Sequence, residues 1–337
     1  MKVRAQSLGG YPRPRSVRRL LRQSERGEVD PEYRVRLLAS ASSAVIGAQI
    51  AAGFDVVVDG MLDWHDIFRP FASAWRNVTP TALLRYFDNN FFYRIPLFTA
   101  EPEPVEPVLA PRVRLYAPLA EPAGLKVVVP GPVTFTLMSE VIGGLRRDEL
   151  AEAIARLLAD EVRAAVEAGA SFVQVDEPIL GDPEVGRDEA SLAADLASRI
   201  AGAAGEAETM LAVYFYPPKR EVYEEVLKAK VDYVMIDAVD GGGKGATLVA
   251  EAGGGRKGVA LGVIDARSIY MDRYEGVKSL VEAALEGLRE KESLILTTST
   301  WLDLIPYSYS IKKTRLLGLY AERIAGDLGL EYTGGWR

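Results

Sequence analysis

The chain of 337 residues contains no cysteine and only one histidine, His65. The absence of thiols excludes disulfide bonds, a thiolate nucleophile, iron–sulfur clusters and every zinc site built on cysteine. A metal cage made of several histidines is excluded as well. A transition metal held by this chain alone would therefore depend on carboxylates with at most one imidazole.

Long apolar runs and positive net charge are also missing. No apolar run approaches the roughly 18 residues that span a bilayer, and the opening residues MKVRAQSLGGYPRPR lack the apolar region of a signal peptide. We therefore expect a cytoplasmic protein. The net charge of −7 disfavours general binding to nucleic acid or to an acidic membrane surface. A content of 48% hydrophobic and 26% charged residues is typical of a globular domain with a large core.

What the chain does contain is a regular alternation of short apolar runs with helical patterns. The runs predict strands buried on both faces of a parallel sheet. They are Lys2–Leu8, Asp55–Asp59, Lys126–Pro130, Phe172–Asp176, Leu211–Phe215, Tyr233–Asp237, Val259–Asp265 and Ser293–Thr298. Apolar residues at helical spacing lie between them, and a long helix is predicted from Pro31 to about Ala52, with Gly53 as its end. Eight strands alternating with helices predict an α/β protein, a single (β/α)8 TIM barrel over residues 1–337.

One proline-rich segment interrupts this rhythm. Between Thr99 and Gly124 the chain carries six prolines, three of them in EPEPVEP. Proline favours extended backbone and disfavours helix interiors. We therefore expect an extended insertion or hairpin over about 99–124, between barrel strands two and three.

Polar residues at the predicted strand ends are the first candidates for chemistry, because the loops after the strands build the active face of a TIM barrel. Asp176, Glu177, Asp237 and Asp265 occupy such positions, and Arg267 follows closely. Carboxylates placed together act as general acids and bases. Acidic residues at these positions equally serve to cap the helices that follow. Both interpretations stay open from the sequence.

His65 and a run of arginines offer two further candidates. His65 lies between acidic residues in DWHDIF, where an imidazole can shuttle protons or simply hydrogen-bond its neighbours. The segment 13–22 contains five arginines. Such a run can clamp a polyanionic ligand through bidentate contacts, or form a solvated helix face.

Several segments, in order along nearly the whole chain, resemble the cobalamin-independent methionine synthases. PGPVTFTLMSE (130–140) and FVQVDEPIL (172–180) form the most specific pair. Supporting matches are the segments 8–29, 83–98, 262–270 and 296–308. The likeness is greater to the N-terminal of that family's two barrels than to its catalytic C-terminal barrel.

The resemblance implies a zinc-dependent methyl transfer, but this chain lacks the residues that hold the zinc in the family. The family transfers a methyl group from methyltetrahydrofolate polyglutamate to homocysteine, whose thiol is activated by a zinc ion. The zinc is held by His, Cys, Glu and Cys in the C-terminal barrel. This chain reads LAVYFYPP (211–218) and TTSTW (297–301) at the strands where a catalytic barrel has its His and Cys ligands. The resemblance thus implies no metal site and no cofactor in this chain, with methyltetrahydrofolate polyglutamate as a ligand.

Three functions follow from these observations. In the first, the chain is the non-zinc barrel of a split enzyme, which binds folate or its partner, a separate zinc-bearing catalytic barrel. By resemblance, Arg18, Arg19 and Arg85 would then bind the folate polyglutamate tail. In the second, it is an independent metal-free enzyme acting on an amino-acid-like substrate, because the residue matching Asp176 holds the amino group of homocysteine in the family's catalytic barrels. In the third, it is a scaffold that regulates a catalytic barrel.

Overall fold

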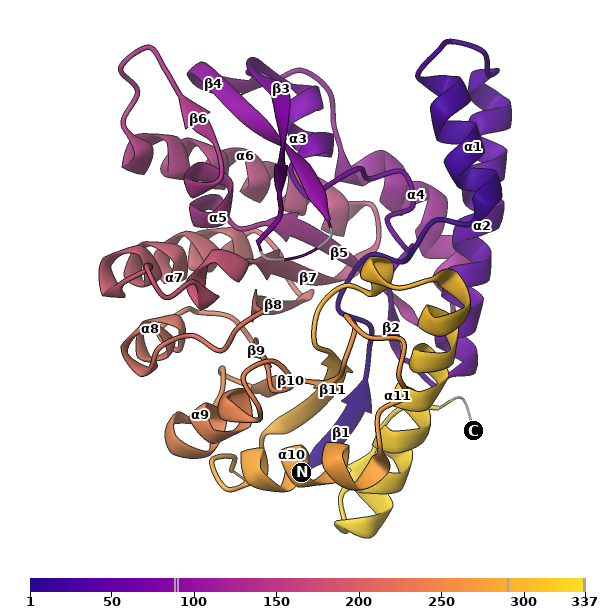
Figure 1. Cartoon of the computed structure of the whole chain (residues 1–337), viewed down its shortest axis with the longest axis vertical. Helices are drawn as coiled ribbons and strands as arrows, with labels where there is room; N and C mark the ends of the chain where they lie inside the picture. The colour runs from indigo at the N-terminus through magenta and orange to yellow at the C-terminus, as the bar shows by residue number, and fades with distance from the viewer. Residues whose placement is uncertain (88, 90, 290, 336–337) are drawn as a thin grey trace.

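The structure is a computed structural model that describes residues 1–87, 89, 91–289 and 291–335. Over these residues the main feature is a curled parallel sheet of nine strands in the order β12-β1-β11-β10-β9-β8-β7-β5-β2, with helices on its outer side (Figure 1). The strands are β1 Lys2–Ala5, β2 Val56–Val57, β5 Gly124–Pro130, β7 Ala170–Asp176, β8 Glu208–Val213, β9 Tyr233–Asp237, β10 Gly258–Ile264, β11 Ser293–Thr298 and β12 Glu331–Tyr332. The predicted α/β, TIM-barrel-like class is confirmed.

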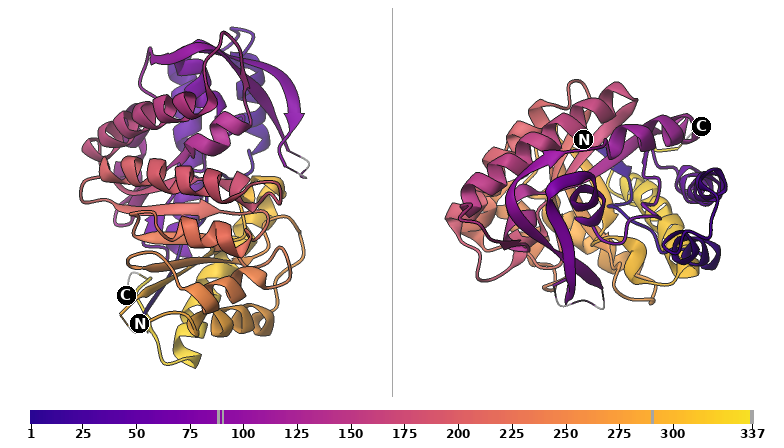
Figure 2. Two further views of the ribbon diagram at one scale, coloured as in Figure 1. Left: turned by 90° about the vertical axis from the view of Figure 1, so that its left-hand side faces the viewer. Right: turned by 90° about the horizontal axis from the view of Figure 1, so that it is seen from above.

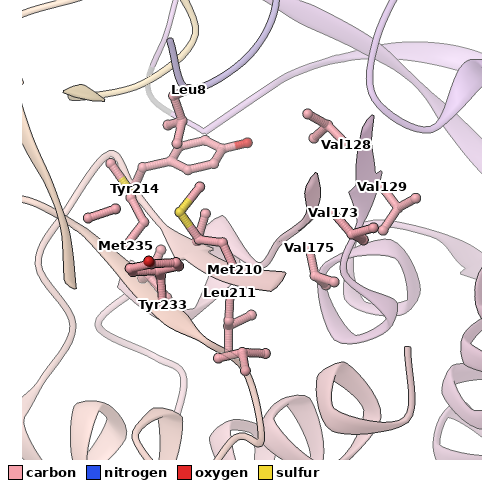
Figure 3. Close-up of a cluster of buried hydrophobic side chains, with 14 of the residues drawn as sticks. Leu8, Val128, Val129, Val173, Val175, Met210, Leu211, Tyr214, Tyr233 and Met235 are labelled. Carbon is pink, nitrogen blue, oxygen red and sulfur yellow. The ribbon is translucent and has the colours of Figure 1, made fainter. Parts of the chain in front are cut away.

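Each of the eight apolar runs overlaps one of these strands, although β5, β7, β8 and β10 begin one to three residues earlier than predicted. Continuous burial explains the agreement, since every residue of β9 and β10 is buried and such strands leave a strong signal in the sequence. Buried side chains of β5, β7, β8 and β9 belong to one core, in which Leu8 and Met210 lie next to the ring of Tyr214 (Figure 3). The two ends of the chain lie side by side, because β12 pairs with β1.

Helices α2, α4 and α6 to α11 cover the outer face of the sheet, whereas α1 packs on α2 and α3 packs on the hairpin. In chain order the helices are α1 Arg15–Ser24, α2 Pro31–Ala51, α3 Arg69–Ala74, α4 Leu109–Ala120, α5 Pro132–Leu137, α6 Arg147–Glu167, α7 Arg187–Gly202, α8 Arg220–Val226, α9 Lys244–Ala252, α10 Tyr274–Leu285 and α11 Tyr307–Asp327, with short 3-10 turns η1 Pro178–Gly181 and η2 Leu302–Leu304. The predicted limits of α2, from Pro31 to about Ala52, are confirmed. Asp30 caps it by accepting a hydrogen bond from the Tyr33 amide (2.9 Å). No helix in the described part of the chain is long and apolar enough to cross a membrane.

A second, three-stranded sheet lies at one end of the molecule's long axis (Figures 1 and 2). Strands β3 Trp75–Arg85 and β4 Phe92–Pro104 form an antiparallel hairpin, and β6 Glu140–Val141 adds to β4. The hairpin falls between β2 and β5, as an insertion between strands two and three would. Its limits differ from the predicted 99–124, because the hairpin begins at Trp75 and ends at Pro104.

Much of the predicted extended segment is in fact the helix α4. Its start is stabilised from a distance, since the Glu161 carboxylate of α6 accepts hydrogen bonds from the amides of Val108 (3.0 Å) and Leu109 (2.9 Å). Pro111 stands in the first turn, where a missing N–H costs no helical hydrogen bond. Proline content alone therefore misled the prediction, because the cap comes from a residue about fifty positions away.

Candidate functional site

A cleft of about 440 Å³ opens at the carboxyl ends of the strands, between the loops that follow β1, β2 and β11. Phe91, between the two hairpin strands, forms part of its wall. The charged lining combines three arginines with two carboxylates, and the rest consists of aromatic side chains, prolines and other apolar residues. The volume is within the range of small-molecule pockets, and the location is where TIM barrels place their active sites.

Helix α1 supplies the basic side of the cleft. Its buried face carries Val17, Leu20 and Leu21. On the exposed face the arginines follow i, i+3, i+4, i+7 spacing, which aligns them on one side of a helix. They are Arg15, Arg18, Arg19 and Arg22. Their side chains make no ion pair or hydrogen bond with another described residue, and Arg15 and Arg18 line the cleft. Two guanidinium groups are thus available to an anionic ligand at its rim.

Arg13 belongs to the same run but has a structural contact. It donates hydrogen bonds to the carbonyl oxygens of Leu62 (2.9 Å) and Trp64. Burial lowers the pKa of its guanidinium. Arg13 therefore ties the loop after β1 to the loop after β2 and helps to fix the shape of the cleft.

Asp176, the strongest candidate from the sequence, is completely buried and fully hydrogen-bonded. Its carboxylate accepts from the Gln174 amide (2.6 Å), the Tyr214 hydroxyl (2.9 Å) and the Trp301 indole N–H (3.0 Å). Burial raises its pKa to about 6, although these hydrogen bonds act in the opposite direction. In this structure Asp176 faces protein donors, and it holds Trp301, which lines the cleft.

A buried lysine extends this polar network into the sheet interior. Lys126 of β5 donates to the Ser7 carbonyl (2.5 Å) and to Gln174 Oε1 (2.8 Å). Burial lowers the pKa of the Lys126 ammonium to about 7. Gln174 thus bridges Lys126 and Asp176, so one hydrogen-bonded chain runs from the interior to the wall of the cleft.

Glu177 has the hydrogen bonds of a capping residue. Its buried carboxylate accepts from the amides of Val133 (2.9 Å) and Thr134 (2.7 Å), at the start of α5, and from the Thr134 hydroxyl (2.6 Å). Burial raises its pKa to about 7. The preceding Gly131 is required, because a Cβ there would lie 2.0 Å from Cδ of Glu177. The two specific motifs of the sequence, PGPVT and VDEP, are therefore in direct contact.

Asp237, Asp265 and Arg267 form a separate group beyond the cleft lining. Arg267 donates to Asp240 (3.0 Å), and the Asp265 carboxylate accepts from the Arg267 amide (2.8 Å). Asp237 accepts from the Val239 amide (2.8 Å). Burial, together with the neighbouring Asp240, raises the pKa of Asp237 well above its usual range. The ends of β9 and β10 thus hold a cluster of carboxylates around one arginine.

The remaining predicted residues are dispersed. His65 lies 3.5 Å from Glu25, and burial, reinforced by the nearby Arg13, lowers its pKa. Arg85 is exposed at the end of β3. Of the predicted binding residues, the structure places only Arg18 in the cleft lining. Asp303, which no pattern in the sequence singled out, also lines the cleft, and burial raises its pKa to about 7.

The strand ends where a catalytic barrel would hold zinc are occupied by other contacts. Phe215, after β8, packs against Phe87 (5.1 Å between ring centroids) and Tyr86 (5.7 Å). After β11, the Ser299 hydroxyl accepts from the Ala266 amide (3.1 Å). Among the described residues, no group of three or more His, Cys, Asp or Glu is placed to hold a metal. Aromatic and hydroxyl side chains in these contacts do not fit a tetrahedral zinc.

The curled parallel sheet with a cleft at its strand ends defines a TIM-barrel-like protein, with the cleft on the face where such proteins place their active sites. Residues 4–298 match the family described as the catalytic domain of cobalamin-independent synthase, and the chain belongs to this family. The segments of the sequence resemble the N-terminal barrel of these enzymes more than the catalytic one, whereas the matching family is described by their catalytic domain.

Individual relatives agree with this assignment. The chain is 27% identical to a methionine synthase of Sulfurisphaera tokodaii over 51% of each chain. It is 24% identical to a 5-methyltetrahydropteroyltriglutamate–homocysteine methyltransferase of Thermotoga petrophila, over 89% of this chain and 42% of the relative. The match thus spans about half or less of the length of these relatives. The B12-independent methionine synthase structure from Shewanella sp. W3-18-1 shares the fold, with a TM-score of 0.78 and 18% identity over 96% of this chain and 98% of that one.

Proposed function

We propose that this chain is the folate- or partner-binding barrel of a methionine-synthase-type methyltransferase. It would take part in methyl transfer from 5-methyltetrahydropteroyltriglutamate to homocysteine, the reaction for which several relatives are named. A separate catalytic barrel would supply the zinc. The observation that carries this proposal is the cleft at the strand ends, with Arg15 and Arg18 at its rim.

The proposal includes a closed eightfold barrel. Eight strands follow one another around the sheet in barrel order from β1 to β11 to β2. The loops after β1 and β2 are joined by a hydrogen bond from the Tyr11 amide to the Gly60 carbonyl (2.9 Å). This contact between the two loops supports the proposed closure of the sheet between β1 and β2.

Two features support a partner that carries the zinc. The first is the set of aromatic and hydroxyl contacts after β8 and β11, together with the absence of a metal-ligand group among the residues that the structure describes. The second is the apolar surface around the strand ends, since monomeric proteins rarely expose large apolar side chains in groups. Leu83, Leu84 and Phe92 are exposed on the hairpin, and Ile269, Tyr270 and Met271 are exposed after β10.

Replacing Arg18 or Arg85 by alanine is expected to weaken binding of 5-methyltetrahydropteroyltriglutamate about tenfold, because each removes a charge-assisted contact to a carboxylate of the tail. Isothermal titration measures the effect. Arg163→Ala, which removes an exposed arginine of α6 paired with Asp160, serves as the control and should bind as the parent does. Equal affinity in the two test variants and the parent would contradict the role of these arginines.

An independent enzyme is the second candidate function. The carboxylate cluster after β9 and β10 favours it, because a buried carboxyl group with a strongly raised pKa is typical of acid–base sites. In this alternative Asp237, Asp265 and Arg267 would act on a small substrate without a metal. The turnover of the isolated chain distinguishes the two functions.

A further inference from the structure

Asp237, at the end of β9, is a buried carboxyl group whose two oxygens are treated differently by the protein. Its Oδ1 accepts hydrogen bonds from the amides of Val239 (2.8 Å) and Asp240 (3.2 Å). Its Oδ2 is buried as well, but no N–H or O–H group of a described residue donates to it. Buried polar atoms are nearly always paired, so the state of this oxygen needs a physical explanation.

The side chain of Asp240 supplies that explanation. It lies at hydrogen-bonding distance from the Asp237 carboxyl group, and its own Oδ2 accepts from Arg267 (3.0 Å). Two ionised carboxylates in contact repel each other, whereas a carboxylic acid donates a strong hydrogen bond to a carboxylate. Burial, together with the charge of Asp240, raises the pKa of Asp237 well above its usual range. One proton and the Arg267 guanidinium then balance the charge of the two carboxyl groups.

Other charged or titratable groups stand on the elements around Asp237. They are Asp265 and Arg267 after β10, Tyr216 after β8 and Lys244 at the start of α9. Asp265 accepts from the Arg267 amide (2.8 Å), and the Arg267 side chain also bonds to Tyr216. Lys244 is exposed. The ionisable group that acts most strongly on Asp237 is Asp240, so the two carboxyl groups behave as a pair.

The loop after Asp240 depends on this pair for its shape. Gly241, Gly242 and Gly243 all have positive φ (80°, 66° and 91°), and glycines lose the most backbone freedom when a loop becomes ordered. The ends of the segment are fixed. The Ala238 amide donates to the Gly262 carbonyl (3.0 Å), and a Cβ at Gly245 would lie 2.1 Å from the Asp237 carbonyl oxygen. Between these ends the Asp240 side chain ties the loop to β9 and to Arg267.

We propose that Asp237 and Asp240 share one proton, and that this proton keeps the loop of residues 239–243 closed, so that the loop opens as the pH rises. Residues of the loop and of α9 line an open hollow of about 780 Å³, together with Tyr216, Pro217 and Pro218. This hollow shares no lining residue with the cleft described above. Opening of the loop changes one wall of the hollow, and the device does not depend on the proposed function.

The direction of the pH effect follows from where the proton is held. In the open loop Asp237 meets water and has the ordinary pKa of an aspartate, about 4. In the closed loop it keeps its proton to a higher pH. Between these two pKa values the closed loop binds one proton more than the open loop, so the opening equilibrium rises by up to about tenfold per pH unit. Below about pH 4 both forms are protonated and the dependence disappears.

Hydrogen exchange of the amides in residues 238–245, measured by mass spectrometry at pH 5 and pH 7, tests the proposal. After correction for the intrinsic exchange rate, protection in the parent should fall at least about tenfold between the two pH values. Asp237→Asn cannot ionise, but its side-chain amide can still donate to Asp240, so its protection should stay constant. Asp195→Asn changes an exposed aspartate of α7 and should behave as the parent does.

A second variant and an internal reference keep the test interpretable. Asp240→Asn leaves no carboxylate beside Asp237, so its protection should fall less with pH than that of the parent. Exchange in α7 reports whether each variant is folded. If Asp237→Asn does not fold, the comparison of the parent with Asp240→Asn decides, and an equal fall in these two proteins would contradict the shared proton.

Three other results would overturn the proposal. Constant protection in the parent would mean that no proton is released as the pH rises. An equal fall in the parent and in Asp237→Asn would mean that other groups cause the pH effect. Protection that Asp237→Asn has already lost at pH 5 would mean that the Asp237 carboxyl group holds the loop through packing, and not through a proton.

Discussion

Replacing Asp176 by alanine is expected to lower the free energy of unfolding by about 3–5 kcal/mol, the range for breaking a buried, hydrogen-bonded charged group. The substitution leaves the Tyr214 hydroxyl and the Trp301 indole N–H without an acceptor. It also removes the carboxylate that Gln174 connects to the Lys126 ammonium. None of these groups reaches water, because all are buried. Urea denaturation at pH 7, followed by far-UV circular dichroism, measures the loss.

Two further variants identify the cause of that loss. Asp176→Asn keeps an oxygen that can accept from Tyr214 and Trp301, so it should lose less stability than the alanine variant. Asp195→Ala changes an exposed aspartate of α7 and should stay within about 0.5 kcal/mol of the parent. A loss below about 1 kcal/mol for Asp176→Ala would mean that water or other groups replace the carboxylate.

Replacing Arg112 by alanine is expected to cost a similar amount, about 3–5 kcal/mol at pH 7. Arg112 of α4 pairs with both Asp59 and Asp63 at 2.5 Å. Its guanidinium also lies 5.7 Å from the Trp64 ring and 5.6 Å from the Tyr116 ring. Without it, two largely buried carboxylates remain next to each other in the loop after β2.

The pH dependence separates this charge effect from lost packing. Burial acts to raise the pKa of Asp63, but Arg112 outweighs it and the pKa is lowered. A lowered folded-state pKa stabilises the fold above the unfolded pKa of about 4. That stability is lost as the pH falls through the folded value. The difference between parent and Arg112→Ala should therefore shrink below about pH 4.

A control variant, measured at the same two pH values, tests whether the effect is specific to Arg112. Arg156→Ala removes an exposed arginine paired with Glu101 and should cost less than about 1 kcal/mol at any pH. Thermal or urea unfolding of the three proteins at pH 7 and below pH 4 gives the comparison. A difference between parent and Arg112→Ala that does not change with pH would show that packing, and not charge, is what Arg112 supplies.

Local signals in the sequence predicted most of the fold. The strands are continuous apolar runs, and α2 is bounded by Asp30, Pro31 and Gly53, whose roles depend only on their immediate neighbours. Helix α4 could not be predicted in the same way. Its N-terminus is capped by Glu161, a residue of another helix, and only the tertiary fold brings the two together. The start of the hairpin at Trp75 was missed for a similar reason, because pairing with β4 determines it.

The site was predicted less completely, since its contacts join distant positions. Asp176 was correctly placed at a strand end, but its partners Tyr214 and Trp301 lie 38 and 125 residues away in the chain. Because Asp176 accepts hydrogen bonds from these two side chains, its carboxylate holds Trp301 in the wall of the cleft. Asp303 follows that tryptophan by two residues, and its place in the cleft lining becomes evident only once the fold is known.

If this chain binds and positions the folate substrate while a separate barrel supplies the zinc chemistry, the chain alone should not form methionine. The test supplies the purified chain with zinc, homocysteine and 5-methyltetrahydropteroyltriglutamate, and measures methionine formation. We expect no methionine above the rate without protein. Methionine formed over many turnovers by the chain alone would contradict the claim, because the thiol would then be activated without any cysteine ligand.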